Sequence, residues 1–381
     1  MTRITFLLLS VLLTLPALGH ADNLVARAPQ IAASGYILMD AVSGQTLVEH
    51  NADQALPPAS LTKMMTTYVV DHELARGNIS LKDAVRISVK AWRTGGSRMF
   101  IREGTLVTVD DLLKGVIISS GNDASVALAE HIAGSEDAFA DLMNRHAERL
   151  GMHNSHFRNA TGLPAAGHVS SPRDMAILAR AIIDDFPEHY ALYKEKSFTY
   201  NDISQNNRNL LLWRDPSVDG LKTGHTEEAG YCLVASAKQD NQRLISAVFG
   251  ANSEQARAIE SQKLLTWGFR FFETYHAYDA GEKLAETPVW FGKQRSVMLG
   301  AGSDLVMTIP RDSQARLQAN MTLPASVEAP IQAGSQLGEV IISLDGEELQ
   351  RYPLVALDDI EQAGMLTRLW HHVLRFFSNL F

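Results

Sequence analysis

The sequence has few of the residue types that mark disulfide-rich, nucleic-acid-binding or metal-binding proteins. Its single cysteine, Cys232, has no partner for an intrachain disulfide and lies in the apolar run GYCLVASA, which indicates a small buried residue. The 34 lysines and arginines are outnumbered by 43 aspartates and glutamates, and no basic run is interleaved with aromatic residues, so we predict no nucleic-acid partner. The 13 histidines include no His-Glu-x-x-His motif, and we predict neither a metal nor a cofactor.

The amino terminus has no apolar run long enough for a comfortable membrane span, which needs roughly 20 residues. A shorter apolar stretch, Phe6 to Leu15, follows Arg3 and precedes the small residues Gly19 and Ala21. This arrangement is typical of a secretory signal peptide. We therefore predict that residues 1–21 are removed after Ala21 and that the mature protein is exported.

The chain does contain enough apolar sequence, 46% of its 381 residues, to bury a sizeable core, and its length suggests two domains. Residues 35–51 have the pattern of a hairpin, residues 108–152 carry helical periodicity, and three strand-like runs lie between 218 and 251. Ser253 begins a helical pattern that continues to Tyr275. Strands at both ends of a helical middle predict an α/β (α+β) domain over residues 22–281, with one sheet covered by helices.

The sequence after about Ala280 changes to short β-like runs, with Asp345-Gly346 as a hairpin turn signal. No repeat of 20–50 residues and no low-complexity tract is visible. We therefore predict a small all-β domain, a β-sandwich, over residues 282–357.

The final segment, residues 358–381, is amphipathic. Its apolar residues fall on one face of a helix, and Arg368, His371, His372 and Arg375 fall on the other. These polar residues make it a poor transmembrane span, so we predict a membrane-anchoring helix that lies in the lipid interface. The alternative is a final helix packed on the β domain. We expect the acidic residues that precede the helix to form a mobile connector.

Ser60 and Lys63 lie three residues apart on a segment that otherwise has the periodicity of a buried helix. Pro57 and Pro58 favour a helix that starts near Ser60 and places its hydroxyl at the positive end of the helix dipole. In one interpretation, Ser60 is an N-terminal cap and Lys63 a solvated cation. In the other, Ser60 is a nucleophile and Lys63 its base, once burial or neighbouring cations lower the pKa of the lysine.

Two further motifs favour the second interpretation. Ser120-Gly121-Asn122 interrupts two helical patterns with a turn, and Lys222-Thr223-Gly224 ends a strand. With the serine-lysine pair they give the order Ser-x-x-Lys, Ser-x-Asn, Lys-Thr-Gly. This is the motif set of penicillin-binding proteins and class A β-lactamases.

The residues in and around these motifs resemble one branch in particular, the low-molecular-mass penicillin-binding proteins that act as D-alanyl-D-alanine carboxypeptidases. The resemblance covers nearly the whole mature chain, and its KTGHT and LTWGFRFF segments are more specific than the bare motifs. It implies a serine β-lactamase/DD-peptidase-like domain with an antiparallel sheet covered by helices. A small all-β domain and a C-terminal amphipathic helix are implied to follow.

The resemblance also implies a serine mechanism. Ser60 attacks the carbonyl between the two D-alanines of a peptidoglycan stem peptide, and Lys63 takes its proton. Ser120 and Lys222 relay that proton to the leaving amine and hold Lys63 in a workable protonation state. Asn122 binds the peptide backbone of the substrate.

Substrate binding is assigned by the same resemblance to Asn122, Lys222, Thr223, Gly224, His225 and Arg257, with Arg208 as a weaker candidate. The backbone N–H groups of Ser60 and His225 form the oxyanion hole in this assignment. Thr223, Lys222 and Arg257 bind the terminal carboxylate.

Other functions share parts of this pattern. A β-lactamase needs a carboxylate that activates water, and no convincing Glu-x-x-Leu-Asn element lies between the second and third motifs, so we expect a stable penicilloyl adduct. The sequence does not separate carboxypeptidase from DD-endopeptidase action. A non-catalytic wall-binding scaffold would have no chemical need for both lysines.

The partners implied by the resemblance are peptidoglycan stem peptides ending in D-Ala-D-Ala, with β-lactams as inhibitors. The implied location is the periplasm, with the C-terminal helix attached peripherally to the outer face of the inner membrane.

Overall fold

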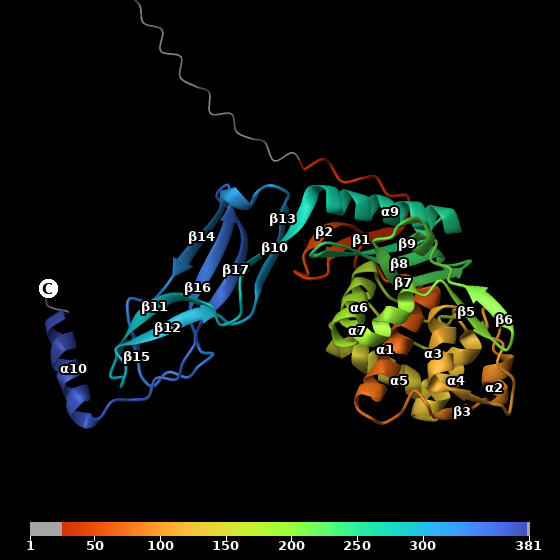
Figure 1. The fold of residues 1–381 in the computed structure, drawn as a ribbon, viewed down its shortest axis with the longest axis horizontal. Helices are drawn as coiled ribbons and strands as arrows, with labels where there is room; N and C mark the ends of the chain where they lie inside the picture. The colour runs from red at the N-terminus through yellow and green to blue at the C-terminus, as the bar shows by residue number, and fades with distance from the viewer. Residues whose placement is uncertain (1–24, 379–381) are drawn as a thin grey trace, which may run out of the picture.

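The computed structural model describes residues 25–378, and its first domain is built on a five-stranded antiparallel sheet (Figure 1). The predicted signal peptide lies outside the described residues. The strand order is β2-β1-β9-β8-β7, so strands from the two ends of the domain meet in one sheet, as the sequence predicted. The five strands are β1 (Gly35–Asp40), β2 (Thr46–His50), β7 (Val218–Thr226), β8 (Gly230–Gln239) and β9 (Gln242–Ala251).

One face of this sheet is covered by the long helix α9 (Glu254–Phe271), which lies across β8 and β9 in Figure 1. Ser253 caps the helix by accepting a hydrogen bond from the Ala256 N–H at 3.0 Å. Leu264 and Leu265 are fully buried against apolar side chains of the sheet. The helix thereby seals one side of the domain core.

The other face carries α6 (Pro172–Asp185), and α1 (Thr62–Ala75) lies at the centre of the helical layer beneath it. Helices α3 (Val109–Ile117), α4 (Asn122–Ala133), α5 (Glu136–Arg149) and α6 all contact α1. The first residues of α1, from Thr62 to Asp71, are buried on every side. Any polar side chain in that stretch is therefore kept away from bulk water.

The remaining elements of this domain lie in the chain between β2 and β7. The predicted helical middle is present as α3, α4 and α5. These elements are η1 (Ala59–Leu61), β3 (Ala84–Arg86), α2 (Val89–Arg93), β4 (Leu106–Thr108), α3 (Val109–Ile117), α4 (Asn122–Ala133), α5 (Glu136–Arg149), α7 (Pro187–Tyr190), η2 (Ala191–Lys194), β5 (Ser197–Tyr200), β6 (Ile203–Asn206) and α8 (Leu211–Arg214).

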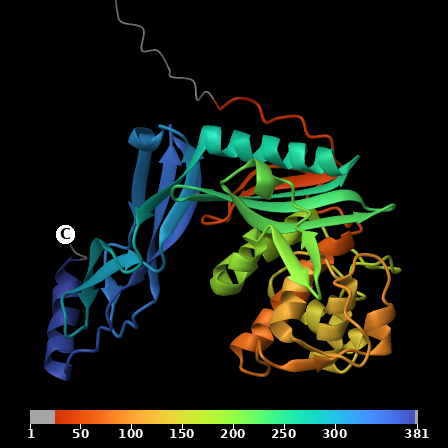
Figure 2. The same cartoon turned by 45° about the vertical axis from the view of Figure 1, so that its right-hand side comes forward.

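The second domain is all-β, as predicted, and stands beside the first in Figures 1 and 2. A six-stranded sheet in the order β14-β16-β17-β12-β11-β15 and the β10-β13 pair enclose a separate apolar core. Its elements are β10 (Phe272–Tyr278), β11 (Lys283–Trp290), β12 (Ser296–Ala301), β13 (Leu305–Pro310), η3 (Gln314–Arg316), β14 (Leu317–Thr322), β15 (Val327–Glu328), β16 (Gln336–Leu344) and β17 (Glu347–Ala356).

The junction between the domains corrects the sequence prediction. Helix α9 ends at Phe271 and not at Tyr275, because the chain from Phe272 onward pairs with β13 and the strand ladder satisfies its backbone groups. Strand β10 thus belongs to the second sheet system and precedes the boundary at residue 281. Across the junction, Thr274 Oγ1 donates to Asp40 Oδ2 at 2.5 Å.

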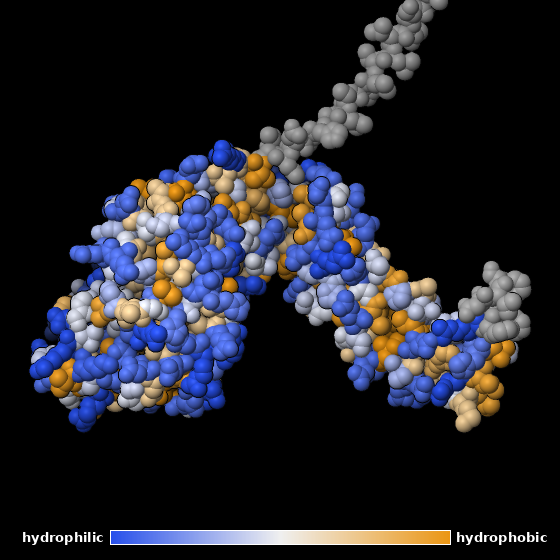
Figure 3. All heavy atoms as spheres, turned by 180° about the vertical axis from the view of Figure 1, so that it is seen from behind, coloured by the Kyte–Doolittle hydropathy of each residue, from blue (hydrophilic) through white to orange (hydrophobic). Residues whose placement is uncertain are grey.

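The C-terminal helix α10 (Met365–Ser378) turns its apolar side chains away from the β domain. Met365 and Leu366 are each 85% exposed, and Figure 3 shows hydrophobic side chains gathered at this end of the molecule. On the opposite side, His371 Nδ1 accepts a hydrogen bond from the Phe291 N–H at 2.8 Å. Within residues 25–378, none of the helices combines the length and apolar character that crossing a membrane requires.

The acidic segment before α10 is paired, so the expectation of a mobile connector was wrong. Ile360 is buried and bridges to Ile331, and Asp359 Oδ1 accepts a hydrogen bond from the Ala333 N–H at 2.8 Å. Glu361 forms an ion pair with Lys293. Apolar burial and strand-like pairing outweigh the solvating effect of the acidic residues.

Candidate active site

Ser60 lies inside the 3₁₀ turn η1, immediately before α1. Its side chain caps neither element, so the N-cap interpretation was wrong. The preceding residue, Ala59, has a φ of 47°, and two glycines press against this turn. A Cβ atom on Gly162 would lie 1.8 Å from the Ala59 carbonyl oxygen, and one on Gly224 would lie 2.9 Å from that of Pro58. Strand β7 therefore approaches the serine turn as closely as backbone atoms allow.

Lys63 is buried on the first turn of α1 and contacts three oxygens. Its Nζ donates to Ser60 Oγ at 3.1 Å, to Asn122 Oδ1 at 2.6 Å and to the Thr161 carbonyl oxygen at 2.5 Å. Its exposed fraction is 0%, so the solvated-cation interpretation was also wrong. The amine is held within hydrogen-bond reach of the serine hydroxyl.

The surroundings of Lys63 favour the neutral amine. Burial lowers its pKa to about 7, and the positive charge of Arg208 acts in the same direction while Asp123 opposes it. An ordinary lysine is almost fully protonated at neutral pH. Lys63 can therefore accept a proton near pH 7, which a general base requires.

A second lysine-serine pair faces the first. Lys222 Nζ on β7 donates to Ser120 Oγ at 3.0 Å and to the Thr223 carbonyl oxygen at 3.3 Å. Ser120 precedes α4 with a φ of 58°, and both side chains are buried. Burial is also the main cause that lowers the pKa of Lys222, followed by the charge of Lys63. The charge of Lys63 thus disfavours protonation of Lys222.

Asn122 connects Lys63 to the loop formed by residues 95–97. Its Oδ1 accepts from Lys63, and its Nδ2 donates to the Gly95 carbonyl oxygen at 2.7 Å. The backbone N–H of Asn122 donates to the Ser97 carbonyl oxygen at 2.7 Å. The side-chain amide is consequently fixed in one orientation between the buried lysine and the 95–97 loop.

A cavity of about 400 Å³ opens over these groups. Lys63, Asn122 and Lys222 lie behind its wall and reach it through their hydrogen bonds. Tyr231, which the sequence analysis missed, stacks on the predicted His225 with ring centroids 4.0 Å apart. The residues that line the cavity are Ser60, Ser97, Ser120, Arg208, Thr223, Gly224, His225, Tyr231, Glu254 and Arg257.

Arg257 brings a buried positive charge to the cavity from α9. Its Nη1 donates to the Gly224 carbonyl oxygen at 3.2 Å, and its guanidinium lies 5.6 Å from the centre of the Tyr231 ring. Burial lowers the pKa of Arg257, and the Glu254 carboxylate counteracts that effect. With Thr223 and the nearby lysine, the arginine makes this end of the cavity suited to an anion.

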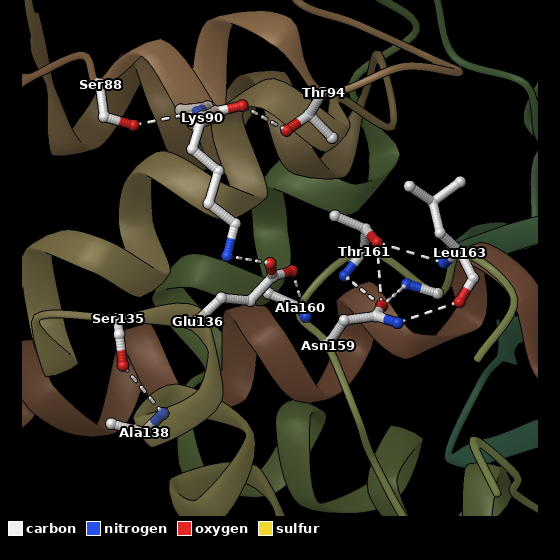
Figure 4. Close-up of polar contacts among 12 residues, drawn as sticks. Ser88, Lys90, Thr94, Ser135, Glu136, Ala138, Asn159, Ala160, Thr161 and Leu163 are labelled. Atoms are coloured by element: carbon white, nitrogen blue, oxygen red, sulfur yellow. Dashed lines mark hydrogen bonds and ion pairs between the residues drawn. The ribbon is translucent and has the colours of Figure 1, made fainter. Parts of the chain in front are cut away.

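The sequence analysis also missed the loop that supplies the Thr161 carbonyl to Lys63. Figure 4 shows Asn159 at its centre: Oδ1 accepts from the N–H groups of Thr161 at 3.1 Å and Gly162 at 2.7 Å, and Nδ2 donates to the Leu163 carbonyl oxygen at 3.0 Å. The turn-forming composition of FRNATG is the signal that marks this loop in the sequence.

This loop is held from outside by an ion pair that Figure 4 also shows. Lys90 Nζ lies 2.8 Å from Glu136 Oε2, and Glu136 Oε1 accepts a hydrogen bond from the Ala160 N–H at 3.2 Å. Lys90 comes from α2 and Glu136 from the first turn of α5. Three separate segments therefore determine where the Thr161 carbonyl lies.

A second hollow, of about 480 Å³, adjoins the other side of the serine turn. Its lining includes Pro58 and Ala59 before the serine, the loop from Gly162 to Val169, and Glu228 after β7. A peptide bound across Ser60 would therefore contact a polar, cationic cavity on one side and a groove lined by small residues on the other.

Comparison with known proteins identifies the family. A family model described as D-alanyl-D-alanine carboxypeptidase matches residues 22–253, and one described as penicillin-binding protein 5, C-terminal domain, matches residues 272–362. The chain belongs to the D-alanyl-D-alanine carboxypeptidase family.

Relatives in this carboxypeptidase family are similar over almost the whole chain. The chain is 47% identical to D-alanyl-D-alanine carboxypeptidase DacC of Escherichia coli, over 95% of this chain and 93% of the relative. It is 43% identical to DacA of Haemophilus influenzae, over 100% of this chain and 98% of the relative. The crystal structure of penicillin binding protein 5 from Haemophilus influenzae superimposes with a TM-score of 0.87 at 45% identity, covering 88% of this chain and 100% of that one. The predicted DD-peptidase-like fold is confirmed.

Proposed function

We propose that this protein is a serine-type D-Ala-D-Ala carboxypeptidase that removes the terminal D-alanine from peptidoglycan stem pentapeptides. The observation that carries the proposal is the 3.1 Å contact between Lys63 Nζ and Ser60 Oγ, with the lysine buried and its pKa lowered to about 7. The family membership supports the choice of substrate.

In the proposed acylation step, Ser60 Oγ attacks the carbonyl carbon between the two D-alanines and its proton passes to Lys63. The peptide C–N bond then breaks, and the leaving nitrogen takes a proton by way of Ser120 and Lys222, whose atoms are 3.0 Å apart. The backbone N–H groups of Ser60 and His225 stabilise the oxyanion. The products are free D-alanine and a Ser60 ester, which water hydrolyses.

The terminal carboxylate of the substrate binds Thr223, Lys222 and Arg257 in this proposal. Thr223 and Arg257 line the cavity, Arg208 adds positive charge to its lining, and Lys222 lies behind the wall with its amine on Ser120. Asn122 binds the peptide backbone, and the rest of the stem peptide extends into the hollow beside Pro58 and Gly162.

β-Lactams are proposed to acylate Ser60 through the same contacts, because their carboxylate and strained amide imitate the D-Ala-D-Ala terminus. We expect the penicilloyl ester to persist, as the sequence analysis predicted. A β-lactamase and a scaffold are the less favoured alternatives, and DD-endopeptidase action is an additional activity that the same site permits.

Export and membrane attachment are further parts of the proposal. The amino-terminal sequence supports secretion, and the exposed apolar side of α10, including Leu369 and Trp370, supports insertion into the outer face of the inner membrane. The enzyme would then act in the periplasm while tethered at one end.

The test is the release of free D-alanine from a pentapeptide ending in D-Ala-D-Ala, followed together with covalent labelling by a fluorescent penicillin. We expect wild-type protein to do both and Ser60→Ala to do neither while keeping its thermal unfolding temperature. Ser119→Ala removes a neighbouring buried hydroxyl and serves as the control. Undiminished labelling of Ser60→Ala would contradict the proposal, and cleavage of a cross-linked dimer alone would favour an endopeptidase.

A further inference from the structure

Glu254 places a carboxylate in a cavity whose other polar side chains are mainly cations and hydroxyls. It lies in the first turn of α9, where the helix dipole favours an acidic residue, and its side chain is 49% exposed. Helix stabilisation requires only that the charge is near the helix terminus. It does not require the side chain to line the cavity or to contact Arg257, and Glu254 does both.

The contact involves the arginine that the proposed function assigns to the substrate. Arg257 Nη2 donates to Glu254 Oε1 at 3.2 Å, while Nη1 donates to the Gly224 carbonyl oxygen at 3.2 Å. One end of the guanidinium is thus bound to the strand next to the serine turn. The other end already has a carboxylate partner from the protein itself.

We propose that Glu254 is a specificity-determining residue, an internal carboxylate that competes with the terminal carboxylate of the substrate for the Arg257 guanidinium. The inference rests on the proposed function, since it takes the anion site to be a substrate site. A second carboxylate that approaches Arg257 must displace Glu254 or bind beside it, and like charges at that distance repel each other.

This arrangement has two consequences. Glu254 weakens binding of every ligand with an anionic terminus and leaves ligands with a neutral terminus almost unaffected, so it lowers the preference for acids over amides. It also speeds the departure of free D-alanine, whose carboxylate leaves the same arginine. The residue therefore sets the balance between substrate capture and product release.

The alternative role for Glu254 is activation of the water that hydrolyses the acyl-enzyme. Its hydrogen bond to Arg257 opposes that role, because Oε1 already accepts from the guanidinium and would have to leave it to take a proton from water. The two roles predict different kinetics. Competition for Arg257 changes KM, whereas loss of a general base lowers kcat and lengthens the life of the acyl-enzyme.

The experiment compares Glu254→Gln with wild type on two peptides that differ only in their terminus. We expect KM for the free-acid pentapeptide to fall about two- to fivefold, the range typical of a partly exposed ion pair. The deacylation rate should be unchanged, and kcat should be unchanged or lower, the latter where release of D-alanine limits turnover. Inhibition by the same peptide amidated at its terminus should stay constant. In an Arg257→Gln background the effect on the free-acid peptide should be smaller, because only the direct repulsion between the two carboxylates remains, and the amidated peptide should again be unaffected.

Glu227→Gln is the matched control, since it removes the same charge from the exposed turn after β7 without changing a ligand of Arg257. Glu254→Ala provides a second variant and should shift KM in the same direction. An unchanged or higher KM for the acid, an equal change for the amide, or a fall in kcat with slower deacylation would overturn the inference.

A further arm separates this inference from the proposed function. The acylation rate is measured with benzylpenicillin and with its methyl ester, which lacks the negative charge. If wild-type protein is acylated but releases no D-alanine, the carboxypeptidase proposal fails while the acid-to-ester ratio still reports on Glu254. We expect Glu254→Gln to raise that ratio two- to fivefold, and an unchanged ratio would reject the inference.

Discussion

The two domains differ in what they bury. Among the described residues, the first domain buries ionisable side chains such as Lys63, Lys222 and Arg257, whereas the buried polar side chains of the β domain are hydroxyls, namely Thr287, Thr308, Ser313 and Ser343. Burying an ionisable group costs free energy unless its partners compensate for the lost water. The comparison teaches that the buried ionisable groups beside the cavity all come from the first domain, while the β domain buries polar groups that carry no charge.

Not every buried charge in the first domain belongs to the chemistry. Asp123 accepts hydrogen bonds from the backbone N–H groups of Met99, Phe100 and Ile101, and so fixes the loop beside the cavity. The two lysines are different, because their pKa values are lowered and their amines point at serine hydroxyls. Perturbed pKa values in a cavity mark functional groups better than burial alone.

The largest expected effect comes from Lys63→Arg, which keeps the charge and removes the base. A guanidinium stays protonated at neutral pH, so we expect kcat/KM to fall by about 10²–10⁴-fold. The rate of D-alanine release measures this, with Lys114→Arg in a surface ion pair as the control. Activity within a few-fold of wild type would contradict the role of Lys63 as the general base.

A smaller loss is expected from Asn159→Ala, which releases the loop carrying the Thr161 carbonyl. Misplacing that acceptor of the Lys63 amine should lower the acylation rate about 10- to 10²-fold. The carbonyl favours the protonated amine, so its displacement should also move the acid limb of the pH profile to lower pH. Asn154→Ala, at an exposed hydrogen bond, is the control, and an unmoved limb would indicate a purely structural role.

Arg208→Gln should change the pH dependence more than the maximal rate. The charge of Arg208 lowers the pKa of Lys63, so its removal raises that pKa above about 7. Lys63 acts as a base only when neutral, so activity falls as the pH drops below its pKa. In the variant this acid limb of the pH profile should therefore lie at higher pH. The pH profile of acylation by a penicillin measures the shift, and Arg214→Gln is the control. A limb displaced to lower pH would refute this account.

The smallest effect on catalysis is expected from deletion after Ala363, which removes α10 and leaves the buried Ile360 pairing in place. Hydrolysis of a soluble pentapeptide should be unchanged, because His371 of the helix contacts Phe291 and Trp290 of the β domain, away from the cavity of the first domain. Binding to anionic lipid vesicles should be lost, and Trp370→Glu in the full-length protein should weaken it. The assignment of α10 as a membrane anchor would be contradicted if the mature protein never binds vesicles or if truncation unfolds the β domain.

The sequence predicted the elements whose signals are local. The ordered motifs around Ser60, Ser120 and Lys222, the helical middle, the β-rich second half and the amphipathic tail are all patterns of a few neighbouring residues, and each corresponds to an observed element. The prediction was wrong where contacts with residues far along the chain determine the local structure. The helix expected to reach Tyr275 gives way to pairing with β13, and the acidic connector is held by Ile331 and Lys293.

The sequence by itself determined which residue types carry the chemistry and in what order. Only the tertiary structure decided that Lys63 is buried, that its amine meets Asn122 and Thr161, and that its pKa is lowered to about 7. The same holds for Glu254, whose contact with Arg257 matters because β7 brings Gly224 and the serine turn to that arginine. The physical reason is that desolvation and charge interactions depend on distance in space, and the groups that set them here come from segments separated by most of the domain.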